Sequence, residues 1–330
     1  MGLDAAHTAL LDGLLLALRS PQLGEPDLGG SGVELSLIGM GRFGGRELGF
    51  ASDIDLIAVY RVPDGANSEQ SAACVKTAER LIAELRRLVS DPRFPVDLDF
   101  DLRPEGRNGP MVRSLDAYAA YYERWSLAWE AQALLRARPV AGDASLGEDF
   151  IALADRIRYP EVFEADSVRE VRRIKARVEA ERLPRGAEPK RHLKLGPGGI
   201  SDVEWLVQLL QLSAGARYPE LRTVSTLAAL AGATEAGLIG EHARDQLEES
   251  WRLASAIRSA AKLWSGRGSD VLPRERSELE GIAGVLGMQP GHTTELEERW
   301  LAVSRRARTV FEREFFGYTD DGLQYPVITG

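Results

Sequence analysis

The sequence predicts an α+β protein, in which a small α/β domain with a mixed sheet is followed by a helical bundle domain. Strand-like segments occur only in the first 110 of the 330 residues, and helical periodicity dominates the remainder. We expect an N-terminal helix and linker over residues 1–30, the α/β domain over residues 31–115 and the helical domain over residues 116–330.

The α/β domain is predicted from an alternation of strand and helix patterns. The first helix covers residues 4–19, and a loop rich in glycine and proline follows over residues 21–32. Strands are expected at residues 33–39, 54–62 and 94–102. Between the last two, residues 69–89 carry apolar side chains at helical spacing, namely Ala78, Leu81, Ile82, Leu85 and Leu88.

The helical domain is predicted from leucine- and alanine-rich stretches that show no alternation with period two. These stretches cover residues 118–136, 167–182, 200–213, 223–231, 241–262 and 294–316. We expect no strand after residue 110, which places the domain boundary close to residues 110–116.

Composition excludes several classes of protein. The chain is 44% hydrophobic and 28% charged with a net charge of −9, as in ordinary globular proteins, and the acidic balance argues against a nucleic-acid partner. Basic clusters at residues 169–177 and 182–194 fit either a local anion contact or a solvated helix face. Cys74 is the only cysteine, and no apolar run is long enough to cross a membrane, so we expect a cytoplasmic protein.

A glycine cluster and an aspartate pair carry the first chemical signal. Five glycines occur between residues 39 and 49, and Asp53 and Asp55 then open the next predicted strand. Glycine backbone can approach a ligand closely, and its amides can hold phosphate oxygens, although ordinary turns also use glycine. Residues two apart on a strand share one face, and neighbouring carboxylates repel. The pattern therefore favours a magnesium ion between the aspartates and a phosphate substrate, the alternative being a solvated strand end.

The third predicted strand adds a second acidic face. Asp97, Asp99 and Asp101 alternate with apolar residues, so all three face one side of a regular strand. One of them would supply a further carboxylate to the metals or accept a proton. The alternative is an amphipathic edge strand whose polar face contacts water.

Together these elements resemble the nucleotidyltransferase superfamily of the polymerase-beta type, which combines a Gly-Gly pair, an Asp-x-Asp pair and a distant aspartate on a neighbouring strand. In that chemistry, carboxylates hold two magnesium ions that bind the attacking and the leaving oxygen. The protein contributes mainly position and charge.

A closer resemblance extends over long strings that occur in order. The sequence is similar to glutamine synthetase adenylyltransferases in GMGRFGGRELGFASDIDLI, DLRPEGRNGPMVRSL, WEAQALLRARPVAGD, VREVRRIKARVEAERLPRG, KLGPGGISDVEWLVQLLQL and RWLAVSRRARTVFEREFFGY. Members of this family carry two nucleotidyltransferase halves, one that removes AMP by phosphorolysis and one that transfers it. This chain resembles the second, C-terminal half. Since it holds one half only, we expect a fragment or a stand-alone relative.

The resemblance implies roles for particular residues. Asp53, Asp55 and Asp99 match the family's catalytic, metal-binding carboxylates, and Gly44 and Gly45 match the Gly-Gly pair that lines the triphosphate. Arg103 and Arg107 are two further candidates for phosphate contact, and a structural salt bridge to nearby carboxylates is an equal alternative for both. Lys194, before Gly196-Pro197-Gly198-Gly199, either reaches the nucleotide or belongs to a structural turn.

The expected activity is transfer of AMP from Mg²⁺·ATP to a tyrosine hydroxyl of glutamine synthetase, which would down-regulate nitrogen assimilation. A PII-type signalling protein is a further candidate partner. Alternatives are phosphorolytic removal of AMP from the synthetase, another transfer such as uridylylation of a PII protein, and a nucleotide-sensing module without turnover. The three matching aspartates disfavour the last, because a sensor does not need three metal carboxylates.

Overall fold

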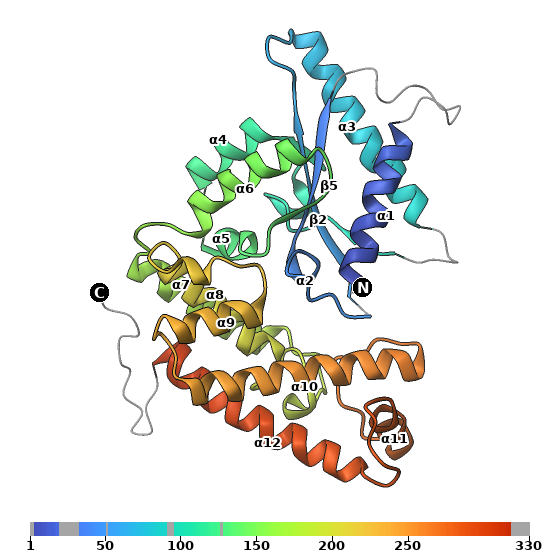
Figure 1. Ribbon diagram of the computed structural model, residues 1–330, viewed down its shortest axis with the longest axis vertical. Coiled ribbons are helices and arrows are strands. Elements are labelled where there is room, and N and C mark those ends of the chain that lie inside the picture. The colour runs from blue at the N-terminus through green and yellow to red at the C-terminus, as the bar shows by residue number, and fades with distance from the viewer. Residues whose placement is uncertain (1–2, 20–32, 51, 91–95, 126–127, 318–330) are drawn as a thin grey trace. The chain divides into compact units, whose positions relative to one another are not determined.

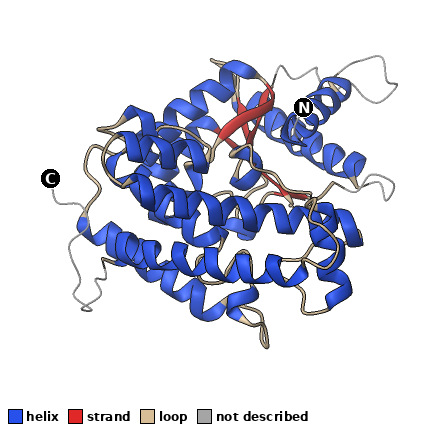
Figure 2. Cartoon of the chain, turned by 60° about the horizontal axis from the view of Figure 1, so that its bottom comes forward, coloured by secondary structure: helices blue, strands red, loops and turns tan. Residues whose placement is uncertain are grey.

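A computed structural model of the protein describes residues 3–19, 33–50, 52–90, 96–125 and 128–317. The chain divides into two compact units, one formed by Met1–Leu48 and Ser52–Arg158 and the other by Gly49–Ala51 and Tyr159–Gly330. The first unit carries the sheet, and the described residues 159–317 of the second form helices joined by loops (Figures 1 and 2). The predicted α+β class with a mixed sheet and a helical part is confirmed.

The sheet of the first unit has five strands. These are β1 (Glu34–Gly39), β2 (Ile54–Arg61), β3 (Leu98–Asp99), β4 (Val112–Ser114) and β5 (Arg138–Gly142). The spatial order is β3-β2-β1-β5, and β4 pairs with the same strand β2 as β3 does. β1 is antiparallel to β2 and β5, whereas β3 and β4 run parallel to β2.

Helices cover both faces of this sheet, as Figure 1 shows. α1 (Leu3–Leu18) and α3 (Ser68–Val89) lie on one face, and α4 (Leu115–Trp125), α5 (Ala128–Leu134) and α6 (Ala144–Arg158) lie on the other. Strand alternation explains the two cores, because Leu56 and Ala58 face α1 and α3 while Ile57 and Val59 face α4 to α6. α3 begins at a capping box in which Asn67 and Gln70 exchange hydrogen bonds.

The expectation of no strand after residue 110 is wrong. β4 and β5 are both part of the sheet, and the compact unit that contains them extends to Arg158, beyond the boundary that we expected at residue 115. Both strands are short, and β5 includes Pro139 at a register shift, so neither shows a clear alternating pattern. The tertiary pairing with β1 and β2 forms them where local sequence gave no signal.

The second unit is built from helices joined by short turns. They are α7 (Ala165–Glu181), α8 (Ile200–Ala214), α9 (Thr226–Glu235), α10 (Glu241–Ser265), α11 (Arg276–Val285) and α12 (Thr293–Phe311), with short 3₁₀ turns at Pro189–Arg191 and Pro219–Leu221. α12 continues into a π-helical turn at Glu312–Phe316. No helix within the described ranges is long and apolar enough to cross a membrane.

Candidate active site

Two of the predicted site residues, Asp55 and Asp99, lie side by side on one face of the sheet. β2 and β3 are parallel, and Asp55 is the register partner of Asp99. Strands in a sheet lie about 4.8 Å apart, so the two carboxylates project side by side. Asp53 lies directly before β2, two residues ahead of Asp55. This face is the one where Ile57 and Val59 pack beneath α4 to α6, and the aspartates extend it beyond the apolar core.

The glycine cluster follows β1 as a short helix, α2 (Gly41–Gly44), with Gly45 directly after it. Gly41 has a φ of +50°, and a Cβ on it would lie 2.1 Å from Oδ2 of Asp55. Glycine is therefore needed here so that the backbone can lie against the carboxylate. Sequence reasoning counted Gly41 among the glycines but did not select it for the site; its position two residues after the strand was the available signal.

Neither Gly44 nor Gly45 has a positive φ. Gly45 has a φ of −69°, and Gly44 is an ordinary helical residue. A Cβ on Gly44 would lie 2.0 Å from the carbonyl oxygen of Arg136 and 2.4 Å from that of Gly39. The requirement at Gly44 is therefore close packing of backbone, and a phosphate contact by either glycine stays a prediction.

An ion pair and two hydrogen bonds hold the glycine segment, residues 39–49, against the neighbouring elements. Arg136 donates to Glu47 at 2.8 Å, and their side chains are only 6% and 7% exposed. Arg138, at the start of β5, donates to the carbonyl oxygens of Phe43 and Gly44 at 3.1 Å each. Burial and the neighbouring Arg46 lower the pKa of Arg138. These contacts hold the backbone around Gly44 in place, and sequence reasoning missed the part that Arg138 and Glu47 play.

The third acidic strand is shorter than residues 94–102. Of its described part only Leu98–Asp99 pairs with β2, because the chain turns immediately afterwards. Oδ1 of Asp99 accepts a hydrogen bond from the backbone N–H of Asp101 at 2.6 Å, which closes an Asx-type turn. The turn removes Asp101 from the strand, so the expected alternation of three aspartates on one face does not hold.

The two arginines after this turn have different environments. Arg103 is 6% exposed and donates to the carbonyl oxygens of Phe100, Arg107 and Gly109, so it has the structural role left open as an alternative. Arg107 has a side chain that is 85% exposed, and it pairs with Asp101 at 2.5 Å, which raises its pKa. The structure thus ties Arg103 to the loop backbone and leaves Arg107 in solvent next to the carboxylates.

Magnesium chemistry fits the donor set. Mg²⁺ takes oxygen ligands and is commonly held by one or two carboxylates together with substrate phosphates. Asp55 and Asp99, in register on adjacent strands, supply such a pair of carboxylates. Among the residues that the structure describes, no three His, Cys, Asp or Glu side chains form a complete metal site by themselves. The metal role of Asp53, Asp55 and Asp99 therefore stays a prediction.

The Gly-Pro-Gly-Gly loop of the second unit is a structural turn. Asp202, fully buried on α8, accepts from the backbone N–H of Gly198 at 2.7 Å and pairs with Nζ of Lys175 at 2.6 Å. A Cβ on Gly198 would lie 1.8 Å from the carbonyl oxygen of Ser304. The loop is thus packed against α12, which favours the structural alternative for the segment after Lys194.

Comparison with protein families divides the chain along the same lines as its structure. Residues 8–152 match the model for glutamate-ammonia ligase adenylyltransferase, and residues 171–315 match the model for GlnD PII-uridylyltransferase. The first match lies within the unit that carries the sheet, apart from residues 49–51, and the second lies within the helical unit.

Curated relatives are similar over most of this chain and are named bifunctional glutamine synthetase adenylyltransferase/adenylyl-removing enzymes. The relative from Leifsonia xyli is 54% identical over 96% of this chain and 30% of its own length. The relative from Streptomyces coelicolor is 50% identical over 86% and 28%, and that from Mycobacterium leprae is 47% identical over 96% and 31%. The chain thus spans about 30% of the length of these relatives. On these sequence similarities, the chain belongs to the glutamate-ammonia ligase, or glutamine synthetase, adenylyltransferase family.

Proposed function

We propose that this chain transfers AMP from magnesium-bound ATP to a tyrosine hydroxyl of glutamine synthetase. The observation that carries the proposal is the parallel register of β2 and β3, which sets Asp55 beside Asp99. The names of the curated relatives support the acceptor, and the single cysteine is compatible with a cytoplasmic enzyme.

The reaction forms a bond between the tyrosine oxygen and the α-phosphorus of ATP while the bond from that phosphorus to the pyrophosphate oxygen breaks. Pyrophosphate leaves with the bonding electrons, and the hydroxyl proton must be removed. We assign metal binding to Asp53, Asp55 and Asp99, and proton removal to Asp99, whose second carboxylate oxygen is not the one bonded to Asp101. Magnesium, when bound, would neutralise charge on the phosphate oxygens and on the attacking oxygen.

Neighbouring residues position the substrate in this proposal. Gly41 lets the chain lie against Asp55, and Arg136 and Arg138 hold the glycine segment that would border the triphosphate. The exposed guanidinium of Arg107 lies at the carboxylate edge and would contact outer phosphate oxygens after leaving Asp101.

The test is incubation of the chain with α-labelled ATP, magnesium and purified glutamine synthetase. Label on the synthetase is expected with the native chain and not with Asp55→Asn, whose fold is checked by circular dichroism. Equal labelling by the native chain and Asp55→Asn would contradict the assignment of the site.

A PII-type protein is a further proposed partner, supported by the match of the helical unit to the uridylyltransferase model. Its addition should change the labelling rate.

A further inference from the structure

A groove runs along α12 in the helical unit, on residues that the proposed reaction does not use. Its volume is about 500 Å³, which is in the size range of small-molecule sites. Six lining residues come from α12 and the first residue of the π-helical turn: Leu301, Ser304, Arg305, Arg308, Thr309 and Glu312. Their spacing of three, four, seven, eight and eleven residues from Leu301 places them on one helix face.

This polar face is distinct from the face with which α12 contributes to the core. Trp300, Val303, Ala307 and Val310 are at most 3% exposed and form the packed side of the helix. The groove side carries two hydroxyls and two guanidiniums. The π-helical turn beginning at Glu312 marks the same end of α12, and such turns are frequent at functional sites.

The opposite wall is held rigidly against the helix. Lys190 and Pro197 complete the lining of the groove. The carbonyl oxygen of Lys190 accepts from Nε1 of the buried Trp300 at 2.9 Å. Gly198, next to Pro197, is packed directly against the Ser304 carbonyl. Both wall residues therefore keep their backbone position without a ligand, as a preorganised site requires.

The charges in the groove are not balanced. Arg308 is paired with Glu179, Asp202 and Glu312 at 2.7–3.0 Å, and Lys175 also pairs with Glu179 and Asp202, so this network holds three carboxylates and two cations. Within the part of the chain that the structure describes, the side chains of Lys190 and Arg305 have no ion-pair partner. Lys190 and Arg305 add two cations to this network of net charge −1, so the groove and the network together carry a net charge of +1.

A buried hydroxyl adds a hydrogen-bond donor. Ser304 is 4% exposed and lines the groove, and its hydroxyl donates a long hydrogen bond of 3.5 Å to the carbonyl oxygen of Leu301. An acceptor in the groove would give this hydroxyl a better partner.

We propose that the groove binds the phosphate group of a small organic phosphate ester. The ammonium of Lys190 and the guanidinium of Arg305 neutralise the anion, and the hydroxyl of Ser304 donates to a third oxygen. Donors that reach the ligand from both walls suit a tetrahedral phosphate better than a planar carboxylate. The groove is larger than inorganic phosphate requires, and Leu301 and Pro197 offer an apolar surface to the organic part.

The test is isothermal titration of the full chain at fixed ionic strength with phenyl phosphate, inorganic phosphate and benzoate. Phenyl phosphate is expected to bind at one site per chain and more tightly than either of the other two. Loss of one charge-assisted hydrogen bond in Lys190→Gln or Arg305→Gln should weaken it about tenfold. The proposal would be overturned if phenyl phosphate showed no saturable binding. It would also be overturned if phenyl phosphate bound no more tightly than inorganic phosphate or benzoate.

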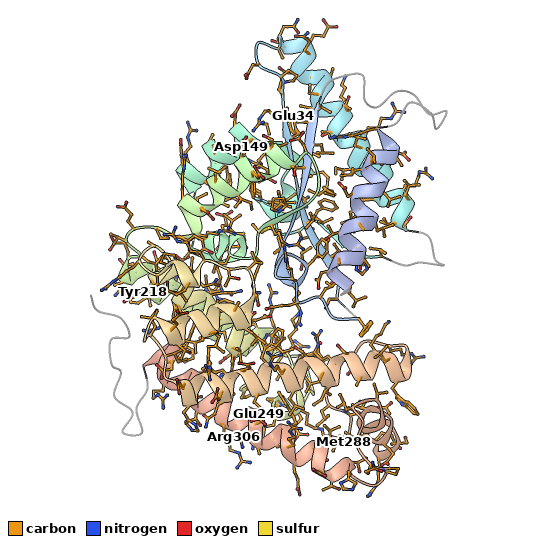
Figure 3. All side chains as sticks on the ribbon, in the orientation of Figure 1. Glu34, Asp149, Tyr218, Glu249, Met288 and Arg306 are labelled. Atoms are coloured by element: carbon orange, nitrogen blue, oxygen red, sulfur yellow. The ribbon has the colours of Figure 1, made fainter. Side chains whose placement is uncertain are left out.

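Two controls separate this groove from other sites. Arg306 is the neighbour of Arg305 but lies outside the groove and pairs with Glu249 on α10 at 2.9 Å. Arg306 and Glu249 are labelled in Figure 3. Arg306→Gln should change the affinity by less than about twofold, since a charge outside the groove acts only through screened solvent. Asp55→Asn should leave it unchanged. If Arg306→Gln weakened binding as much as Arg305→Gln, the attraction would be non-specific. If Asp55→Asn abolished binding, the ligand would lie at the catalytic carboxylates. Either result contradicts the assignment.

Discussion

Gly44 and Gly13 show how differently two glycines depend on the absence of a side chain. A Cβ on Gly44 would lie 2.0 Å from the carbonyl oxygen of Arg136, whereas a Cβ on Gly13, in the exposed part of α1, would have no atom within 4 Å. The fold therefore requires glycine at position 44 and not at position 13.

The first prediction compares alanine at these two positions. Gly44→Ala should destabilise the protein by about 1–3 kcal/mol, the usual range for overpacking. Gly13→Ala should stabilise it by about 0.5–1 kcal/mol, because alanine is the better helix former. Thermal unfolding of both variants measures this, and a Gly44→Ala protein as stable as the native chain would contradict the packing of α2.

The second prediction separates Asp99 from Asp101. Asp99 is in register with Asp55, while Asp101 lies in the turn and pairs with Arg107. Asp99→Asn should lower the turnover of AMP transfer by about 10²–10³-fold, the size expected for loss of a preorganised charge in a site. Asp101→Asn should have a smaller effect and Asp97→Asn a mild one. Turnover is measured at saturating ATP and magnesium, and a larger loss for Asp101→Asn would mean that the third carboxylate is misassigned.

At the scale of elements, one buried ion pair joins the glycine segment to the residues after α5. Arg136 and Glu47 are both less than 10% exposed, in contrast to Arg61 and Glu34, whose side chains are 31% and 43% exposed. Glu34 lies on β1 and is labelled in Figure 3. Arg61 also pairs with Asp149 on α6.

The third prediction follows from this difference in burial. Arg136→Met removes the cation that pairs with the buried carboxylate of Glu47 and should cost about 3–5 kcal/mol. Arg61→Met, the matched control, should cost about 0–1 kcal/mol per exposed pair. Chemical denaturation measures both. If the two substitutions have equal effects, the pair does not hold the glycine segment as described.

The fourth prediction concerns His192. This residue lies between the 3₁₀ turn Pro189–Arg191 and the Gly-Pro-Gly-Gly loop at residues 196–199. The backbone N–H of Leu195 donates to Nδ1 of His192 at 3.1 Å, which requires the neutral ring, and burial lowers the pKa of His192 despite Asp270. Because the folded-state pKa lies below the unfolded value, its stabilisation is present above about pH 6.5 and is lost as pH falls through the folded pKa.

Thermal midpoints between pH 7.5 and 5 test this sign. The native chain should lose stability on acidification, by about 1.4 kcal/mol for each unit by which the pKa is lowered. His192→Gln should lose less over this range, while His242→Gln, at an exposed position on α10, should follow the native chain. A native chain that gains stability as pH falls toward 5, or an unchanged slope in His192→Gln, would contradict this role.

At the scale of the whole chain, long periodic segments were predictable and short ones were not. α3 and α10 follow their apolar spacing, and β1 and β2 are apolar runs bounded by turn residues. β4 and β5 are created by tertiary pairing, and the Asx turn at Asp99 interrupts an alternating pattern that local sequence alone presents as one strand. The Asp-x-Asp pair could be found from spacing, whereas Arg138 and Gly41 required knowledge of what lies opposite them in space.

The two units coincide with two different family models, which allows separate roles for them. The sheet unit carries Asp53, Asp55 and Asp99, and the helical unit carries the phosphate groove along α12. The chain spans about 30% of the length of its curated relatives. The central claim is therefore that this chain transfers AMP by itself.

The most direct measurement follows both directions of the reaction with the 330-residue chain alone. One assay counts α-label moved from ATP to glutamine synthetase, and the other counts ADP released from adenylylated synthetase in the presence of phosphate. We predict label transfer that depends on magnesium and on Asp53, Asp55 and Asp99, without release of ADP. Release of ADP without label transfer would contradict this prediction, as would label transfer that survives Asp55→Asn.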